Sequence, residues 1–549
     1  MPAAALLLPV ALLAAGALLA EAAGRVRPGA GRTPVALFAW AALAALLLLW
    51  VPQRNPIDLN LGDLGAGIRF VLRLDAVSFA FSLFVLLPSA LLLTFQRNPS
   101  PPLAALATAG AVLTLLAGGL VLAALAWGAT FLLVLLLVQA GGEPAPSGAR
   151  FRQQAAWLLL IWAAAALSAR AGTDQYAAVP VSALQAPIFG LVALAAVIAS
   201  GLVPWKPWPA VLWERLPPEL AGLAILPLYF TGFYFLARMY QAGGGHLPGT
   251  FFNLALAALG AACALFAALR AQAAGSRRSY FSEVLPMGGG FALLALGLGT
   301  ALGVAAAIAT LAAVALLAAL LPLVGDDALS GRLMLALIVV VGLPPTAVFG
   351  TRLLDLQAAV ESNEVGGYLA LLAAGAWLIG IAGAARAVRL GPRREAGRGS
   401  TRAAALVGAL VVAGGAGLGV LQATIAVPAA AALLPFPGTA LTGMPYATAT
   451  ASGSWPAVAL GGLAVLATLL LAVAGRGRAV PALSGAVPAP LLAPRWEVLP
   501  ERLGTIVDSL EVPAEFRVTA WKSFDQAMAR GSVWLWIAIF VVLALVVAR

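Results

Sequence analysis

Very few residues able to do proton or ion chemistry lie near the hydrophobic segments of this sequence. Arg352 and Asp355 are three residues apart, one turn of a helix, so their side chains can pair. They form either part of a proton path or a structural pair at a helix end. Asp75 lies beside Arg73 and Arg69 at the mouth of another segment. We interpret that group as a surface ion pair, with an ion-uptake site as the alternative.

Other chemistries find little support in the sequence. The single histidine, His246, sits in the glycine-rich loop 243–249, away from any partner motif. The single cysteine, Cys263, excludes an intrachain disulfide and is typical of a small packed residue. No phosphate-binding loop, metal-spaced Cys/His cluster or Ser/His/Asp set occurs. We therefore predict no catalytic residue, no bound cofactor and no metal site.

The composition indicates a membrane protein. The chain has 549 residues, of which 62% are hydrophobic and only 10% charged, whereas about a quarter of residues are charged in soluble domains. Runs of the length needed to cross a bilayer, about 20 residues, recur along the chain. We predict an all-α polytopic bundle of about sixteen spans: 3–22, 35–51, 76–95, 103–119, 120–139, 153–170, 186–203, 220–237, 251–269, 284–300, 301–323, 333–350, 367–385, 403–422, 456–474 and 532–548.

The basic residues set the expected orientation. If the N-terminus lies outside, 25 of the 32 lysines and arginines fall in loops on the cytoplasmic side, as the positive-inside rule requires. We therefore interpret the net charge of +11 as a topological signal and expect no nucleic-acid partner. The stretch 1–23 is interpreted as a retained first helix. The predicted location is the inner (cytoplasmic) membrane, multi-pass, with both termini outside.

Two predicted extramembrane pieces lie near the C-terminus. The stretch 424–454 is rich in proline, glycine, threonine and alanine, and is interpreted as an outer loop. The stretch 476–530 is the longest hydrophilic portion, and its spacing permits an amphipathic helix lying along the inner membrane face. A solvated linker is the alternative.

Five short motifs, in order, resemble those of one family: the antiporter-like membrane subunits of respiratory complex I, membrane-bound hydrogenases and Mrp-type cation/proton antiporters. The motifs span roughly residues 70 to 390 and are 73–78 (RLDAVS), 201–208 (GLVPWKPW), 231–238 (TGFYFLAR), 277–282 (RRSYFS) and 342–352 (GLPPTAVFGTR). The lateral segment and a last span resemble the longer, sixteen-helix members.

The resemblance implies inverted helix repeats in which helices 7 and 12 are broken. The residues expected at these breaks are Pro204, Trp208, Pro344 and Pro345. Broken helices are tolerated in a membrane where they line a cavity or are packed in protein. The predicted divisions are 1–72 (helices 1–2 and an outer loop), 73–203 (first repeat), 204–390 (second repeat), 391–475 (helices 14–15) and 476–549 (lateral segment and last helix).

The resemblance also implies a row of buried charged residues that moves protons or sodium ions, and this row is largely missing here. The positions that match the family's charged residues are Gly128, Ala199, Phe230 and Leu317. The twelfth-helix position keeps a basic residue, Arg352, but arginine, with a pKa above about 12, does not relay protons well. Both lysines, Lys206 and Lys522, lie outside the predicted spans.

These features predict a membrane-arm subunit of a complex-I-like or hydrogenase-like redox complex with weak or lost proton pumping, acting as a scaffold or coupling subunit. Such a chain is at most a non-catalytic subunit of a translocating enzyme. Its partners would be other membrane subunits, the bilayer, and a soluble protein at the cytoplasmic face. The alternatives are the membrane subunit of a two-component transporter, for example for inorganic carbon, and an active proton channel using Arg352 and Asp355.

Overall fold

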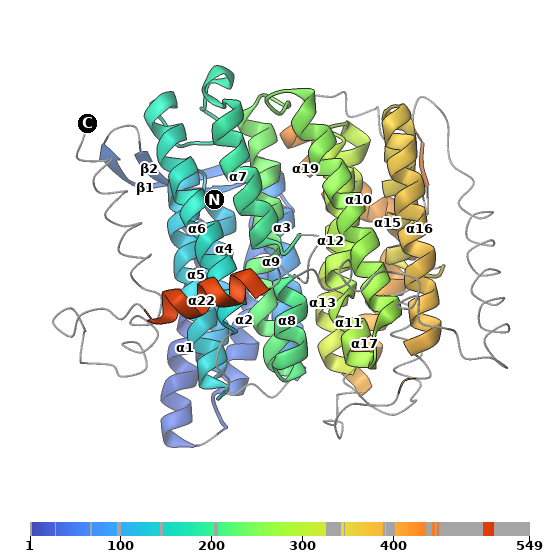
Figure 1. Cartoon of the computed structure of the whole chain (residues 1–549). Coiled ribbons are helices and arrows are strands. Elements are labelled where there is room, and N and C mark those ends of the chain that lie inside the picture. Colours follow the sequence, from blue (N-terminus) through green and yellow to red (C-terminus); the bar gives the residue numbers. More distant parts are fainter. Residues whose placement is uncertain are drawn as a thin grey trace. The chain divides into compact units, whose positions relative to one another are not determined.

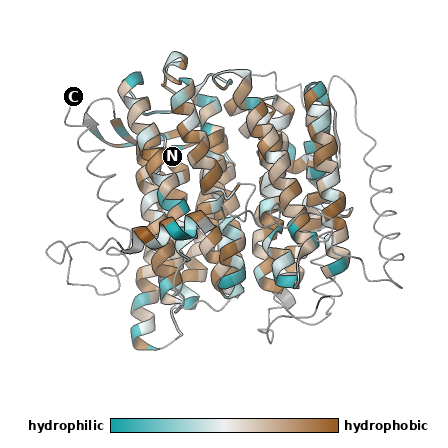
Figure 2. Ribbon diagram, viewed as in Figure 1, coloured by the Kyte–Doolittle hydropathy of each residue, from teal (hydrophilic) through white to brown (hydrophobic). Residues whose placement is uncertain are grey.

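The protein is described here from a computed structural model. The described residues are 3–27, 29–65, 68–95, 100–142, 146–202, 207–324, 342–344, 346–387, 390, 401–434, 442–444, 447–449 and 498–509. They are mainly helical, as predicted, because a bilayer offers backbone N–H and C=O groups no other partners. Apolar residues dominate the helices, and hydrophilic ones gather at helix ends and on α22 (Figure 2).

The chain divides into two compact units: one comprises 1–201, 223–248 and 495–549, and the other 202–222 and 249–494. The helices of unit 1 are α1 (Leu8–Val26), α2 (Arg32–Trp50), α3 (Ala76–Phe95), α4 (Pro101–Leu116), α5 (Leu120–Ala140), α6 (Ser147–Ala171), α7 (Ala186–Ala199), most of α9 (Pro218–Ala242) and α22 (Val498–Ser509), with short turns η1 (Ala3–Leu7) and η2 (Val181–Ala183). In Figure 1 they are coloured from blue through cyan to green, with α22 in red.

Unit 2 is a second helical bundle with its own core. Its elements are α8 (Trp208–Arg215), α10 (Thr250–Ala273), α11 (Arg277–Ser282), α12 (Val284–Gly297), α13 (Ala301–Val324), α15 (Ala347–Ser362), α16 (Glu364–Ala387), α17 (Thr401–Ala416), α18 (Leu418–Leu421), η3 (Gln422–Ala426), α19 (Val427–Leu433), and the strands β3 (Thr442–Met444) and β4 (Ala447–Ala449). Helices α10, α12, α15 and α16 enclose a core built largely from alanine and leucine.

Small residues let α10 and α12 approach closely. A Cβ added to Gly260 would lie 2.2 Å from the backbone nitrogen of Leu294, and one added to Gly290 would lie 2.5 Å from that of Ala264. In membranes, where burial of apolar side chains gives no advantage over lipid, such close backbone packing drives helix association. The glycine run 288–290 is therefore a packing face.

A β-hairpin was not predicted from the sequence. Strand β1 (Ile57–Gly65) pairs antiparallel with β2 (Ile68–Leu74), and apolar residues alternate with polar ones over residues 57–61 of β1. This period of two favours a half-buried strand over a helix. The hairpin ends one residue before α3 begins. It therefore fixes the position of the residue that precedes this helix.

Ten described helices are long and apolar enough to cross a bilayer, or eleven if the pair 405–415 and 418–433, bent by 81°, counts as one span. The predicted number of sixteen is therefore not confirmed. The two last predicted spans, 456–474 and 532–548, lie outside the described residues. The predicted divisions of the chain stay predictions.

Within the predicted seventh span, α7 ends at Ala199 and Gly201 takes a positive φ of 66°, while the predicted break stays a prediction. Pro204 lies outside the described residues, and Trp208 opens the short helix α8. Pro345 is also outside them, whereas Pro344 precedes α15 in non-helical backbone. The predicted boundary of the twelfth span at residue 350 is wrong, because α15 continues to Ser362.

The lateral segment is described over α22, which lies across the direction of α6 in Figure 1. Its contact with α6 is close: a Cβ on Gly504 would lie 2.6 Å from the carbonyl oxygen of Ser147. Leu499 and Ile506 remain exposed on its apolar side. An amphipathic helix is therefore present within the predicted stretch 476–530.

Candidate functional site

Asp75 caps the N-terminus of α3. Its Oδ1 accepts the backbone N–H groups of Val77, at 3.1 Å, and Ser78, at 2.9 Å, while Ser78 Oγ accepts the N–H of Asp75 at 2.8 Å. This reciprocal arrangement satisfies N–H groups that have no partner within the helix. The carboxylate is thereby held in one orientation.

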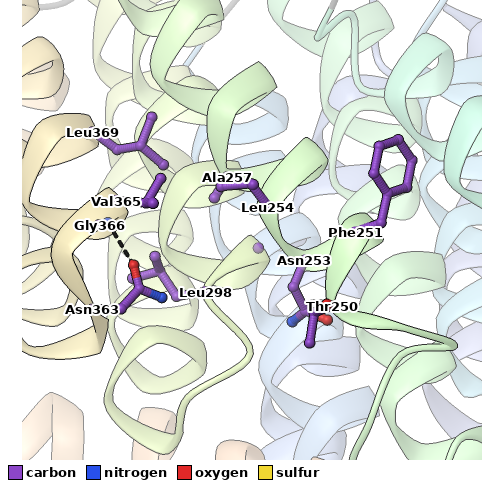
Figure 3. Close-up of a pocket in the computed structure, with 11 residues that line it drawn as sticks. Thr250, Phe251, Asn253, Leu254, Ala257, Leu298, Asn363, Val365, Gly366 and Leu369 are labelled. Atoms are coloured by element: carbon purple, nitrogen blue, oxygen red, sulfur yellow. Dashed lines mark hydrogen bonds between the residues drawn. The ribbon is translucent and has the colours of Figure 1, made fainter.

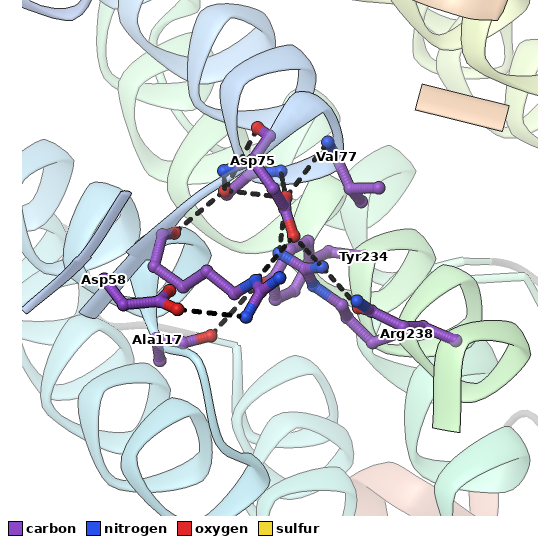
Figure 4. A network of polar contacts seen from close by, with 9 residues as sticks. Asp58, Asp75, Val77, Ala117, Tyr234 and Arg238 are labelled. Atoms are coloured by element: carbon purple, nitrogen blue, oxygen red, sulfur yellow. Dashed lines mark hydrogen bonds and ion pairs between the residues drawn. The ribbon is translucent and has the colours of Figure 1, made fainter. Parts of the chain in front are cut away.

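The partner of Asp75 is Arg238, near the end of α9 (Figure 4). Arg238 Nη1 donates to Oδ2 at 2.7 Å and Nη2 donates to Oδ1 at 2.9 Å, which is a bidentate ion pair. The guanidinium is completely buried, lies 5.0 Å from the ring centre of Tyr234 and 5.4 Å from that of Tyr176, and donates to Gln241. The pair therefore ties α3 to α9 through contacts with little access to solvent.

Arg73 extends this network to the hairpin. Its Nε donates to Asp75 Oδ2 at 3.2 Å and its Nη1 donates to Asp58 Oδ2 at 3.2 Å. The interpretation of Asp75 as part of a surface pair is wrong, because Asp75 is only 3% exposed. Burial alone raises the pKa of Asp75, but Arg238, the Ser78 backbone and Arg73 together lower it to about 2. Asp75 is thus a fixed anion at physiological pH.

A second carboxyl, Asp174, lies at the same hairpin. Its Oδ1 accepts the N–H of Arg69 at 3.3 Å and the side-chain amide of Gln175 at 2.9 Å, and that amide also donates to the carbonyl of Arg69. Burial raises the pKa of Asp174, although the hydrogen bonds from Gln175 and Arg69 oppose the rise. Asp174 and Gln175 also fill the space at Gly119, where an added Cβ would lie 2.3 Å from Asp174 Oδ2.

The interior of unit 1 is apolar at the positions where the family resemblance implies charged residues. A Cβ on Gly128 would lie 2.5 Å from the indole of Trp157, whose Nε1 donates to the carbonyl of Ala124 at 2.9 Å. Phe230 is fully buried between Phe84, with ring centres 6.1 Å apart, and Tyr229, at 5.2 Å. Aromatic side chains therefore pack at both of these positions.

The other two positions are also buried. Ala199, at the end of α7, is 1% exposed, and its carbonyl accepts from the side-chain amide of Gln153 at 3.3 Å. Leu317 lies inside unit 2 on α13 and is 2% exposed. Neither side chain can carry a proton.

Unit 2 retains a buried ionisable group in the middle of α15. Asp355 Oδ2 accepts the hydroxyl of Thr310 on α13 at 2.8 Å, and Arg352 interacts with Asp355 electrostatically. The Arg352 guanidinium lies 3.5 Å from the ring centre of Phe291 on α12. Both charged residues are buried. The interpretation of Arg352 and Asp355 as a helix-end pair is wrong, because they are several residues from either end of α15.

A further buried ion pair was missed in the sequence. Arg270 Nη2 on α10 lies 3.0 Å from Glu283 Oε2, at the start of α12. The side chains are only 10% and 4% exposed. An ionisable residue within or beside an apolar membrane run indicates a candidate functional site. Such positions are held by Arg238, Arg270 and Glu283. In the sequence, Arg238 is visible only as the last residue of the motif 231–238.

The structure brings the three predicted proton-path residues into two separate groups. Asp75 belongs to the network with Arg238 in unit 1, and Arg352 and Asp355 belong to unit 2. Within the described part of the chain, no group of three or more His, Cys, Asp or Glu side chains could hold a metal ion. Buried charged residues are therefore present at the start of α3 in unit 1 and within α15 in unit 2.

Neither a family model nor a curated protein sequence matches this chain. Its structure nevertheless resembles chains of solved membrane complexes. A chain of the Mrp complex from Dietzia sp. DQ12-45-1b aligns with a TM-score of 0.73 and 20% identity, over 99% of this chain and 63% of that one. This chain thus spans less than two thirds of the length of that Mrp chain.

Two respiratory complexes also contain similar chains. One is the membrane-bound sulfane sulfur reductase, an archaeal respiratory membrane complex, with a TM-score of 0.70, 19% identity, and coverage of 98% of this chain and 96% of that one. The other is respiratory complex I from Thermus thermophilus, with a TM-score of 0.63, 21% identity, and coverage of 79% and 99%. At these identities the likeness establishes the fold, which is that of the antiporter-like membrane subunits.

Proposed function

We propose that this chain, which has the fold of the antiporter-like membrane subunits, is a membrane-arm subunit of a multisubunit respiratory complex in the inner membrane. It supports and couples its neighbours, and unit 1 carries no protons across the bilayer. The solved chains that share its fold belong to an Mrp complex, a sulfane sulfur reductase and a complex I. A scaffold needs this architecture but not the titrating groups inside it.

The observation that carries the proposal is the indole of Trp157 at Gly128. A proton path across the membrane needs groups that exchange protons near neutral pH, or water between them. With an added Cβ only 2.5 Å from that indole, Gly128 leaves no room for a carboxylate. The fully buried ring of Phe230 lies between two further aromatic rings. At these two positions the described part of unit 1 therefore carries no titrating side chain.

A second candidate function is proton passage through unit 2. The observation that favours it is the buried carboxyl of Asp355, which accepts from Thr310 and lies near the cation of Arg352. Burying charged groups costs several kcal/mol per ion unless they are well paired, so such a group inside a membrane protein marks a functional site. With this second function, the chain would support its neighbours and also conduct protons through unit 2.

The first experiment identifies the partners. The tagged full chain is purified in mild detergent from its own membranes, and the subunits that accompany it are identified by mass spectrometry. Membrane and redox subunits in fixed proportion are the expected result. A lone soluble partner with a zinc site would instead indicate the two-component transporter, and a chain without partners would contradict the scaffold role.

The second experiment separates scaffold from conductor. The complex is reconstituted in liposomes, and the protons moved per electron are compared for wild type, Asp355→Asn and the matched exposed control Asp58→Asn. A scaffold predicts the same ratio for all three proteins. Loss of the ratio in Asp355→Asn alone, with assembly retained, would refute the scaffold proposal and support conduction by unit 2. Thr310→Val, which removes the hydroxyl donor to Asp355, should then reproduce part of that loss.

A further inference from the structure

The C-terminal end of α7 is buried in unit 1, at the point where the chain leaves that unit. Helix α7 ends at Ala199, and the chain passes to unit 2 after Gly201. Ser200 keeps a helical backbone, and its N–H donates to the carbonyl of Ala196 at 2.9 Å. Gly201 then takes a positive φ of 66°, and its N–H donates to the carbonyl of Ile198 at 3.0 Å. A glycine in this conformation ends a helix without backbone strain.

The first contact that holds this end comes from α6. The last carbonyl groups of a helix have no N–H partner within the helix itself. Here the side-chain amide of Gln153 donates from Nε2 to the carbonyl of Ala199 at 3.3 Å, and Gln153 is only 2% exposed. A carbonyl oxygen can only accept, so this contact sets which way the amide points. The end of α7 is therefore bonded to α6 through a buried side chain.

The second contact is made with α9. Ser200 Oγ donates to the carbonyl of Tyr229 at 3.1 Å, and both residues are fully buried. The two helices approach this closely because α9 has a glycine at the contact. A Cβ added to Gly232 would overlap Ser200 Oγ and the carbonyl oxygen of Ala196. The last turn of α7 is therefore held on a second side, by a hydroxyl that a larger residue on α9 would displace.

A junction between two helices of unit 2 provides a contrast. A cavity of about 460 Å³ lies beside the junction of α15 and α16, where Asn363, Val365 and Gly366 line it (Figure 3). Asn363 Oδ1 accepts the N–H of Gly366 at 2.7 Å, which is a local bond within the junction. Asn363 is exposed and Val365 is 45% exposed. This junction has open space beside it, whereas the end of α7 is enclosed by its partners on α6 and α9.

We infer that the end of α7 is a fixed joint, in which Gln153 and Ser200 hold α6, α7 and α9 together as one body. A hinge needs residues whose φ and ψ change. Rotation at Ser200 would break both contacts and leave buried polar groups without partners, which is costly. Gln153 and Ser200 are thus positioning residues, and α7 does not act as a gate at this end. The inference is independent of the proposed function, because it concerns rigidity and holds whether or not unit 2 conducts protons.

The test measures amide hydrogen exchange by mass spectrometry on the full chain in mild detergent, with its partner subunits if they remain bound. Protection from exchange reports how rarely a segment opens. In wild type, protection should be greater over residues 196–201 than over residues 363–366. Ser200→Ala removes the hydroxyl, and Gln153→Met removes the amide at similar length. Each should speed exchange over 196–201 about fivefold, the change expected from the loss of one typical hydrogen bond, and the double variant should speed it about 25-fold if the two bonds act independently.

Ser168→Ala is the matched control. Ser168 lies on α6 and is 3% exposed, and within the described part of the chain its Oγ has no hydrogen-bond partner. Loss of this hydroxyl should leave exchange over 196–201 unchanged. Residues 157–164, in the middle of α6, should keep the wild-type rate in every variant, which shows that unit 1 stays folded.

Three results would overturn the inference. The first is exchange over 196–201 in wild type as fast as over 363–366, because the end of α7 would then already open. The second is a double variant that exchanges like Ser168→Ala, because the two bonds would then not hold this end. The third is equal acceleration over 157–164, which would mean a general loosening of unit 1 and not the release of a joint. None of these results depends on proton movement, so they are separate from the tests of the proposed function.

Discussion

The buried ion pair between Asp75 and Arg238 should dominate the stability of unit 1. Removing one partner of a buried pair leaves an uncompensated charge, which costs about 3–5 kcal/mol. The fall in the pKa of Asp75 from 3.8 to about 2 corresponds to roughly 2 kcal/mol for the same carboxylate. We therefore expect Asp75→Asn to lower the free energy of unfolding by about 3–5 kcal/mol, although asparagine can still cap α3.

The pH dependence has a defined direction. A carboxylate whose pKa is lowered in the folded state contributes stability that is fully present above its unfolded value and is lost as the pH falls. For Asp75 that loss should run from about pH 4 down through about pH 2. The loss should be absent in Asp75→Asn.

The assay needs a probe inside unit 1. In a Cys263→Ala background, Ala123→Cys places a thiol at a fully buried position of α5, and its labelling in detergent with increasing denaturant reports unfolding. The matched control is Asp58→Asn, whose carboxylate is half exposed and pairs with Arg73. Such a surface pair contributes about 0–1 kcal/mol.

A double-mutant cycle completes the test. Arg238→Met alone should cost about as much as Asp75→Asn, while the double variant should cost less than their sum by up to about 3 kcal/mol, because no buried charge is left unpaired. If Asp75→Asn is no more destabilising than Asp58→Asn, or if the two changes add, the pair does not hold α3 to α9 as described.

Three further predictions concern stability. Because burial raises the pKa of Asp174, its contribution to stability is present below the unfolded pKa and lost as the pH rises through the folded value. Asp174→Asn should remove that loss in unfolding curves recorded from acid to neutral pH. Gly128→Ala should destabilise unit 1 by about 1–3 kcal/mol through overpacking against the indole. A Cβ added at Gly190 meets no atom within 4 Å, so Gly190→Ala should be neutral or stabilising by up to about 1 kcal/mol. Equal changes in melting temperature for the Gly128 and Gly190 variants would contradict this pair of predictions. Gly504→Ala should weaken the packing of α22 against α6 and so speed amide hydrogen exchange over residues 498–509. Unchanged exchange would show that α22 does not require this close contact.

Local sequence patterns predicted much of the architecture. Long apolar runs predicted membrane helices, and the adjoining predicted spans 103–119 and 120–139, like 284–300 and 301–323, are separate helices in the structure. The amphipathic stretch containing α22 was also visible in the spacing of its residues. The hairpin of β1 and β2 was missed, although its alternation of apolar and polar residues was present in the sequence.

Residue identities also showed that the four positions Gly128, Ala199, Phe230 and Leu317 cannot titrate wherever they lie. Sequence could not reveal which side chains pack against them. The indole of Trp157 reaches Gly128 from another helix, and Arg238 meets Asp75 across 163 positions of the chain. Helical periodicity and hydropathy are properties of neighbouring residues, whereas the burial and partners of a charge depend on which helices pack together. Only the tertiary structure therefore separates the fixed anion of Asp75 from the buried carboxyl of Asp355.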